Sequence, residues 1–164
     1  MCYDVYPDQD WIKTIGNAEY VDLDTLLATS DLLSIHVPLL PQTHHLIDAA
    51  AFDKMKENVI LVNTSRGEIV EIPALIKALE SGKLWGCALD VFEGEKKYIF
   101  HDKSKAGFRD HPDLGRLAEM DNVILSSHIA FYTDQAVQQI TAKTLENFQG
   151  FIGKGPLDHK AFVV

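Results

Sequence analysis

The sequence VILVNTSRGEIV, residues 59–70, contains the transition that decides the fold. Its apolar, β-branched first half predicts a buried strand, and small polar residues then lead to Arg66. A helical pattern follows over residues 71–83, with Pro73 near its start and Gly82 as its stop. A strand that passes through a short loop into a helix is one unit of an α/β fold, and this unit places Arg66 at the carboxyl end of the strand.

The same alternation of strand and helix extends along the chain. The predicted strands are apolar throughout, which is typical of a parallel sheet covered on both faces, so we predict an α/β fold with a doubly wound parallel sheet. The strands are predicted at CYDVY (2–6), EYV (19–21), LLSIHV (32–37), VILVNT (59–64), GCALDVF (86–92) and VILSSH (123–128), and the other helices at residues 22–30, 48–55 and 133–151. Residues 93–112 form a charged stretch that predicts an irregular loop.

Composition excludes several functional classes. The chain has 164 residues and a formal net charge of −9, which argues against a nucleic-acid or anionic membrane surface as partner. Its two cysteines, Cys2 and Cys87, lie in apolar runs without a CxxC pair and predict reduced packing residues. No apolar run has transmembrane length, and the first residues lack the pattern of a signal peptide. We therefore expect a cytoplasmic protein.

Ionisable side chains follow the ends of the predicted strands, and they are Asp4, Arg66, Asp90, Glu93, Glu95 and His128. Because the carboxyl ends of parallel strands meet at one edge, we expect these side chains to line a ligand site. An arginine fork binds a carboxylate in two places, and a histidine gives or takes a proton near neutral pH. A carboxylate beside that histidine orients the ring, and an acidic residue after an early strand accepts hydrogen bonds from ribose. The set suits hydride transfer between a nicotinamide and a 2-oxo or 2-hydroxy acid.

Four segments resemble the NAD-dependent D-2-hydroxyacid dehydrogenases, and especially their D-lactate dehydrogenase branch. The segments are YDVYP, SIHVPLLPQTHHLI, VILVNTSRGEIVEIPALIKALESGKLWGCALDVFEGE and NVILSSHIAFYT, and they follow the family's order from Tyr3 to Thr133. Four matching segments in one order make the resemblance specific. It implies a Rossmann-like fold, NAD as cofactor, and a small 2-oxo or 2-hydroxy acid, such as pyruvate or D-lactate, as substrate.

The resemblance also implies catalytic roles. Arg66 would bind the substrate carboxylate and polarise the carbonyl, and His128 would protonate the carbonyl oxygen during reduction. Glu95 would pair with His128, and it is preferred over Glu93 because it holds the family's position in the DVxxxE pattern. Tyr132, in HIAFYT, would face the substrate.

Other matching residues would bind the cofactor. Asp4 would bind the adenosine ribose and favour NAD over NADP, and Asp90 would bind the nicotinamide carboxamide. The cofactor groove would be lined by Val37, Pro38, Thr43, Thr64, Ser65 and Arg66.

The sequence departs from the family at its phosphate loop, because GxGxxG is absent from these 164 residues. Residues 1–132 would be most of the NAD-binding domain without its first strand, and residues 133–164 a C-terminal helix and tail that return to the substrate-binding domain. Met1 could then be an internal methionine. In the strand order 3-2-1-4-5-6, the first strand separates residues 2–6 from residues 33–37, and each buried backbone group that loses its partner costs about 1–3 kcal/mol. We expect an incomplete Rossmann-like sheet and a marginally stable chain.

Two alternatives from other classes stay open. The missing phosphate loop suggests a truncated, non-catalytic product, either a remnant or a subunit completed by another chain. The transcriptional corepressors related to this family suggest an interaction protein, although they resemble this chain less than the lactate branch does. Full-length relatives pair through the cofactor domain, so a homodimer is a further open question.

His44 and His45 raise the question of a metal site. Adjacent residues in an extended chain point to opposite sides, which would keep the two imidazoles apart. No third ligand is evident in the sequence, so we predict that this pair does not bind a metal.

Overall fold

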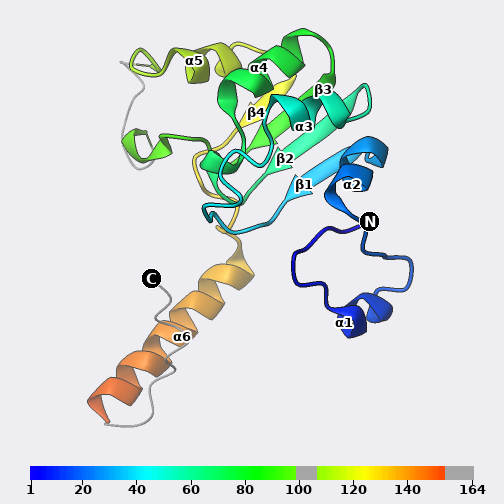
Figure 1. The fold of residues 1–164 in the computed structure, drawn as a ribbon. Coiled ribbons are helices and arrows are strands. Elements are labelled where there is room, and N and C mark those ends of the chain that lie inside the picture. Colours follow the sequence, from blue (N-terminus) through cyan, green and yellow to red (C-terminus); the bar gives the residue numbers. More distant parts are fainter. Residues whose placement is uncertain (99–106, 154–164) are drawn as a thin grey trace. The chain divides into compact units, whose positions relative to one another are not determined.

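The computed structural model describes residues 1–98 and 107–153. The chain divides into two compact units, Met1–His128 and Ile129–Val164. The first unit contains a parallel sheet with its helices, and the second contains one long helix (Figure 1). In the described ranges, no helix has both the length and the apolar character needed to cross a membrane.

A four-stranded parallel sheet dominates the first unit. Its strands lie side by side in chain order, so each connection crosses over the sheet to start the next strand in the same direction. Leu61 illustrates the register, because it pairs with Leu33 on one side and with Cys87 on the other. The predicted parallel α/β sheet is thereby confirmed. The strands are β1 (Leu32–Ile35), β2 (Val59–Asn63), β3 (Leu84–Leu89) and β4 (Val123–Leu125) (Figure 1).

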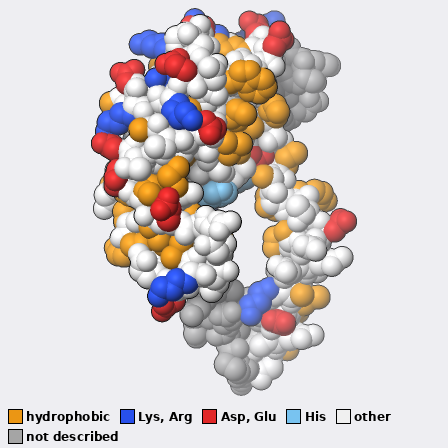
Figure 2. Space-filling view, turned by 90° about the vertical axis from the view of Figure 1, so that its right-hand side faces the viewer, with side chains coloured by type: hydrophobic (Ala, Val, Ile, Leu, Met, Phe, Trp, Pro, Cys, Tyr) orange, Lys and Arg blue, Asp and Glu red, His pale blue; other side chains and the backbone are white. Residues whose placement is uncertain are grey.

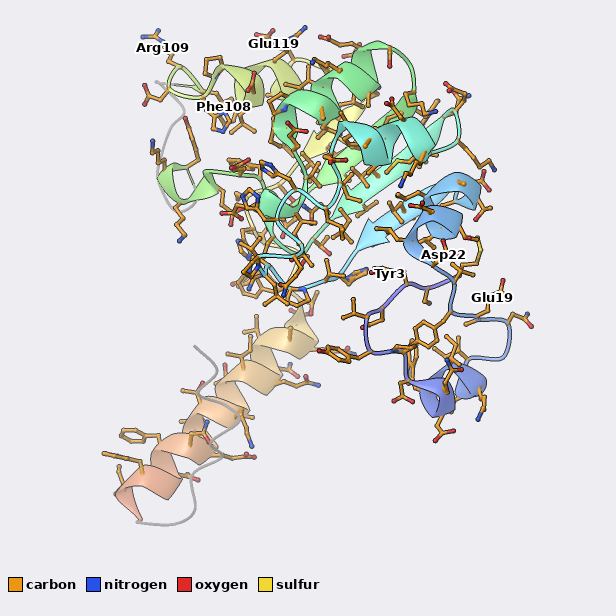
Figure 3. The ribbon with its side chains drawn as sticks, viewed as in Figure 1. Tyr3, Glu19, Asp22, Phe108, Arg109 and Glu119 are labelled. Atoms are coloured by element: carbon orange, nitrogen blue, oxygen red, sulfur yellow. The ribbon has the colours of Figure 1, made fainter. Side chains whose placement is uncertain are left out.

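Several helices begin where the sequence offers a cap. The Asp22 carboxylate (Figure 3) accepts the Thr25 N–H at 2.8 Å, and hydrogen bonds from Thr25 lower the pKa of this carboxyl. Asp48 accepts the Ala51 N–H at 2.9 Å in the same way, and Pro73 lies in the first turn of its helix. The helices of the first unit are α1 (Gln9–Thr14), α2 (Leu23–Thr29), α3 (Ala49–Lys54), α4 (Ile72–Glu80) and α5 (Pro112–Ala118), with short 3-10 helices η1 (Gly67–Ile69) and η2 (Glu95–Lys97).

The core of the first unit lies between one face of the sheet and helices α2 to α5. These helices form a row in which each contacts the next, and α4 and α5 also contact β3 and β4. Leu61 of β2, Leu75 of α4 and Leu117 of α5 are completely buried, and all three belong to one hydrophobic cluster. Burial of each such leucine stabilises the fold by roughly 1.5–3 kcal/mol relative to exposure.

The opposite face of the sheet is more open. Leu32 of β1, Trp85 of β3 and Ile124 of β4 expose 56%, 65% and 68% of their surface. Figure 2 shows hydrophobic side chains at the surface among charged ones on one face of the molecule. We predicted helices on both faces of the sheet. In the described part of this unit, helices α2 to α5 all pack on the same face.

The N-terminal segment differs from the prediction. The strands predicted at residues 2–6 and 19–21 are wrong, since the two stretches form only an isolated parallel bridge between Cys2 and Tyr20, with backbone hydrogen bonds of 2.8 and 2.9 Å. A strand needs a partner along its length, and in the described part of the chain no strand of the sheet pairs with either stretch. The helix α1, which follows Asp8, was not predicted.

The second unit contains α6 (Asp134–Ile152). Thr133 caps this helix, because its hydroxyl oxygen accepts the Ala136 N–H at 3.2 Å. The helix predicted over residues 133–151 is therefore confirmed. No residue of α6 is buried in the described structure, and Phe148 exposes 60% of its surface.

Candidate active site

The loops that follow the four strands lie at one edge of the sheet, because all the strands run in the same direction. Hydrogen bonds connect neighbouring loops. The Ser65 hydroxyl, after β2, donates to the Val37 carbonyl, after β1. The Asp90 N–H, after β3, donates to the Asn63 carbonyl at 2.9 Å. Three successive loops are therefore linked at this edge.

The loop that carries Arg66 is organised by Asn63, whose side chain is completely buried at the end of β2. The Asn63 side-chain amide donates to the Arg66 carbonyl at 2.9 Å, and its carbonyl oxygen accepts the Ser65 N–H at 3.0 Å. The Arg66 guanidinium is exposed and donates to the Ser65 carbonyl at 2.7 Å. No carboxylate in the described ranges forms an ion pair with Arg66, which suits a group that binds an anionic ligand.

Gly67 lets the loop after β2 approach the loop after β3. A Cβ at this position would lie 2.0 Å from the Phe92 carbonyl carbon and 2.4 Å from the Glu93 nitrogen. Both are backbone atoms, so a side chain would force one loop to move. The position of Arg66 is thus set by packing as well as by hydrogen bonds.

His128 and Glu95 form a close acid–base pair. The His128 Nδ1 lies 2.7 Å from the Glu95 Oε1, although the two residues are 33 positions apart. The other carboxylate oxygen, Oε2, accepts the Phe92 N–H at 3.1 Å, which fixes the carboxylate. The Glu95 side chain is 14% exposed and that of His128 is 33% exposed, so the imidazole can meet a ligand while its partner is shielded. A carboxylate that accepts from Nδ1–H leaves Nε2 to exchange a proton with a ligand.

The backbone at His128 is strained. Its φ of 56° lies in the left-handed region, which costs a histidine about 1 kcal/mol or more. The His128 N–H donates to the Asp90 carbonyl at 2.8 Å, and this bond holds the strained turn. Asp90 itself is buried, and its carboxylate accepts a hydrogen bond from the Ser126 hydroxyl. Strain of this kind concentrates at functional positions.

His111 holds the loop that carries Glu95. Its Nε2 lies 3.1 Å from the Glu93 carbonyl, and its Nδ1 accepts the Leu114 N–H at 3.3 Å as the cap of α5. These two bonds require a neutral ring with its proton on Nε2. The ring also packs edge-on against Phe92, with centroids 6.4 Å apart.

His44 and His45 do not point apart as predicted. Their ring centroids lie 4.0 Å apart, and the His45 Nε2 is 3.1 Å from the Glu93 Oε2. The backbone is a turn at this point, with φ of 51° at His45, so the rule for extended chains does not apply. The expectation that the two imidazoles point apart is therefore wrong, and the Glu93 carboxylate lies beside them.

The remaining predicted cofactor residues have different surroundings. The Thr43 hydroxyl donates to the Pro38 carbonyl at 2.6 Å and shapes the turn after β1, and Thr64 is exposed in the loop after β2. Asp4 lies away from any strand, and its carboxylate accepts the Tyr6 N–H at 2.8 Å within an exposed bend. The structure thus joins Val37, Ser65 and Asp90 through hydrogen bonds, while Asp4 bonds to its own segment.

Tyr132 belongs to the second unit, and 73% of its surface is exposed. Its ring packs edge-on against Phe131 with centroids 6.2 Å apart, and its N–H donates to the Ile129 carbonyl at 2.9 Å. Its contact with a substrate stays a prediction.

Four residues that organise the site were not singled out from the sequence. They are Asn63, Gly67, Ser126 and His111. The sequence does offer a signal for Asn63, because it is a polar residue at the end of an otherwise apolar strand. A buried side-chain amide needs hydrogen-bond partners, and those of Asn63 lie in the loop that follows. No comparable signal marks Ser126, because its partner Asp90 is distant in sequence.

Comparison with known proteins identifies relatives for this arrangement. Residues 1–130 match the family model described as D-isomer specific 2-hydroxyacid dehydrogenase, NAD binding domain. The chain is 45% identical over 134 residues to a D-specific alpha-keto acid dehydrogenase of Enterococcus faecalis, which covers 82% of this chain and 41% of that protein. It is 40% identical over 147 residues to a D-lactate dehydrogenase of Escherichia coli, with 90% and 44% covered.

A solved structure agrees with these sequence matches. The D-lactate dehydrogenase of Lactobacillus jensenii with NAD+ superposes with a TM-score of 0.87 at 33% identity, and the match covers 99% of this chain and 47% of that one. The chain therefore spans less than half the length of these relatives. The predicted family, the Rossmann-like fold and NAD as the family's cofactor are confirmed. The chain belongs to the D-isomer-specific 2-hydroxyacid dehydrogenases, and its residues 1–130 are part of their NAD-binding domain.

Proposed function

We propose that this protein is an NAD-dependent dehydrogenase that interconverts a small 2-oxo acid, such as pyruvate, and the corresponding D-2-hydroxy acid, such as D-lactate. The observation that carries the proposal is the 2.7 Å contact between His128 Nδ1 and Glu95 Oε1 at the carboxyl edge of the sheet. Membership of the family and the likeness to D-lactate dehydrogenases of other organisms support it.

The residues at this edge fit the nicotinamide half of the cofactor. Asp90 is only 5% exposed, and its carboxylate, already oriented by Ser126, is an acceptor suited to an amide such as the nicotinamide carboxamide. Val37, Thr64 and Ser65 would line the groove beside it. The 164 residues contain no GxGxxG, so a glycine-rich cradle for the pyrophosphate is not part of this sequence. NADH, when bound, supplies the hydride that reduces the substrate carbonyl carbon.

Arg66 and His128 divide the remaining chemistry. The Arg66 guanidinium would hold the substrate carboxylate through two parallel hydrogen bonds and thereby orient the neighbouring carbonyl. His128 would give its Nε2 proton to the carbonyl oxygen, and Glu95 would stabilise the imidazolium before that transfer. In the oxidative direction His128 would take the same proton back.

The same proposal extends to the organisation of the protein. Residues 1–132 would form most of the NAD-binding domain without its first strand, and residues 133–164 would return to a substrate-binding domain. Tyr132 would face the substrate. The longer form would pair as a homodimer through the cofactor domain. The free thiols of Cys2 and Cys87 and the net charge of −9 support a cytoplasmic location without a nucleic-acid or membrane partner.

The test is His128→Gln in the protein expressed from its complete coding sequence. Glutamine keeps hydrogen-bonding capacity but cannot act as an acid, so kcat for pyruvate reduction should fall about 100- to 10,000-fold. NADH affinity, measured by fluorescence titration, should stay nearly unchanged. Arg66→Lys should instead raise KM about tenfold or more, because lysine lacks the planar fork.

The matched control is Glu119→Gln, an exposed residue that follows α5 (Figure 3) and should turn over like the unaltered protein. Unchanged turnover in His128→Gln would contradict the acid–base role. NADH binding without any turnover in the unaltered protein would favour the non-catalytic alternatives.

A further inference from the structure

A second histidine–carboxylate cluster lies beside the loop after β3, separate from the acid–base pair. One ring nitrogen each of His44 and His45 and a carboxylate oxygen of Glu93 all lie within 4.8 Å of one another. We propose that these three side chains bind a divalent transition-metal cation, with Zn²⁺ as the best fit. The site does not depend on the proposed dehydrogenase activity.

The backbone accounts for the convergence of two adjacent histidines. His45 has a φ of 51°, and its N–H donates to the Glu68 carbonyl at 2.9 Å. The His44 N–H donates to the Leu40 carbonyl at 3.0 Å, so the chain turns tightly here. A left-handed histidine is unfavourable by about 1 kcal/mol, and the turn brings both imidazoles to one side.

The donor set matches the chemistry of zinc. Two imidazoles and one carboxylate are the protein ligands of several zinc sites, and three such ligands leave a fourth position for water or a small ligand. Donors at about 2.0–2.2 Å from a tetrahedral ion lie roughly 3.3–3.6 Å apart. The His45 Nε2 and Glu93 Oε2 are already 3.1 Å apart. His44 is exposed, so its ring can rotate to close the remaining distance.

Accessibility and charge also favour a cation. The His45 and Glu93 side chains are 33% and 41% exposed, so an ion can reach them from solvent. Within the described ranges, no lysine or arginine forms an ion pair with Glu93 and competes for its carboxylate. A bound ion would join the turn after β1 to the loop that carries Glu95 two residues later.

The experiment measures Zn²⁺ binding to the metal-free protein by competition with a chromophoric chelator, and Co²⁺ absorption reports the coordination. His44→Gln, His45→Asn and Glu93→Gln should each weaken Zn²⁺ binding about tenfold or more. Asparagine is chosen at His45 because it tolerates the left-handed backbone. His36→Gln and Glu119→Gln are the matched controls and should bind like the unaltered protein.

Two results of the binding measurement would overturn the site. One is the absence of saturable Zn²⁺ binding, and the other is equal affinity in all five variants. A second measurement needs no variant, since Zn²⁺ should slow modification of His44 and His45 by diethyl pyrocarbonate while His36 reacts at its usual rate. Equal modification with and without Zn²⁺ would reject the site even if a cluster variant proved unstable.

Discussion

The loop from Asn63 to Gly67 and the N-terminal segment from Met1 to Tyr20 both carry residues that the family resemblance assigns to NAD, yet they are held very differently. The loop is fixed by the buried side-chain amide of Asn63 and by the hydrogen bond from the Ser65 hydroxyl to the loop after β1. Backbone contact at Gly67 holds it further. The N-terminal segment instead closes on itself through one isolated bridge, between Cys2 and Tyr20. A segment that matches the family in sequence is therefore held in place only where the groups that form hydrogen bonds with it, and the residues that pack against it, are part of the same chain.

The largest contrast should be that between two cysteines, because Cys87 lies in the sheet that supports the loop and Cys2 lies in the N-terminal segment. Burial raises the pKa of Cys87 in β3 from 9.0 to about 12, so at pH 8 only about one thiol in ten thousand is a thiolate. Cys2 is half-buried in the loosely held segment. A disulfide reagent such as dithiobis(nitrobenzoate) should label Cys2 about 100-fold or more faster than Cys87, as followed by mass spectrometry.

Denaturant should abolish this difference in labelling rate, and equal rates in the native protein would contradict the prediction.

The raised pKa of Cys87 also affects how the stability of the protein depends on pH. Between about pH 9 and pH 12 the unfolded thiol loses its proton while the native Cys87 keeps it, so this group makes the protein less stable as the pH rises.

Gly67→Ala should give the next largest effect. The added methyl would collide with backbone atoms of Phe92 and Glu93, so we expect a loss of about 3 kcal/mol in the free energy of unfolding, measured in urea. Gly16→Ala is the matched change in the N-terminal segment, where φ is +75° but no atom lies within 4 Å of the new Cβ. It should cost about 1–2 kcal/mol, because only the left-handed backbone opposes the new side chain. Equal losses at the two glycines would mean that the close approach at Gly67 does not matter.

Asn63→Ala should destabilise the protein by about 2 kcal/mol, because it leaves the Arg66 carbonyl and the Ser65 N–H without their buried partner. Asn17→Ala, at an exposed position in the N-terminal segment, should change the free energy of unfolding by less than about 0.5 kcal/mol. Urea unfolding of both variants measures the difference. If Asn63→Ala lowered the free energy of unfolding no more than Asn17→Ala, the buried amide would not be what holds this loop.

The smallest expected effect concerns two helices of equal length, α1 and α3, which have six residues each. Asp48→Ala should cost about 1 kcal/mol, because it removes the cap of a helix that buries Phe52 in the core. Asp8→Ala removes the cap of α1 and should cost only a few tenths, because this helix can fray without opening the core. Thermal and urea unfolding should rank the two variants in this order, and the reverse order would contradict the contrast between the regions.

Much of the fold was predictable because its signals are local. Apolar runs located β1 to β4, and Asp22, Asp48 and Pro73 located the starts of three helices. The predicted strand over residues 59–64 runs one residue too far, because Thr64 already lies in the loop after β2. The α5 helix was missed because its cap is a histidine, His111, which is an uncommon capping residue.

The site was less predictable, because its contacts join distant parts of the sequence. Periodicity could place Glu95 and His128 after strands, but only the resemblance could suggest that they pair. The convergence of His44 and His45 depends on one left-handed residue, and nothing in the dipeptide itself signals that conformation. The strand predicted over residues 2–6 failed for a related reason, since an apolar run says nothing about whether a partner strand is present.

The contact at Gly67 also limits how this fold can be redesigned. The loop that carries Arg66 and the loop that leads to Glu95 touch backbone to backbone, with no side chain between them to absorb a change in shape. To introduce a different anion-binding site into this fold, residues 63–67 and 92–95 would have to be replaced at the same time. Two loops that lie 25 residues apart in the sequence would then have to be changed together.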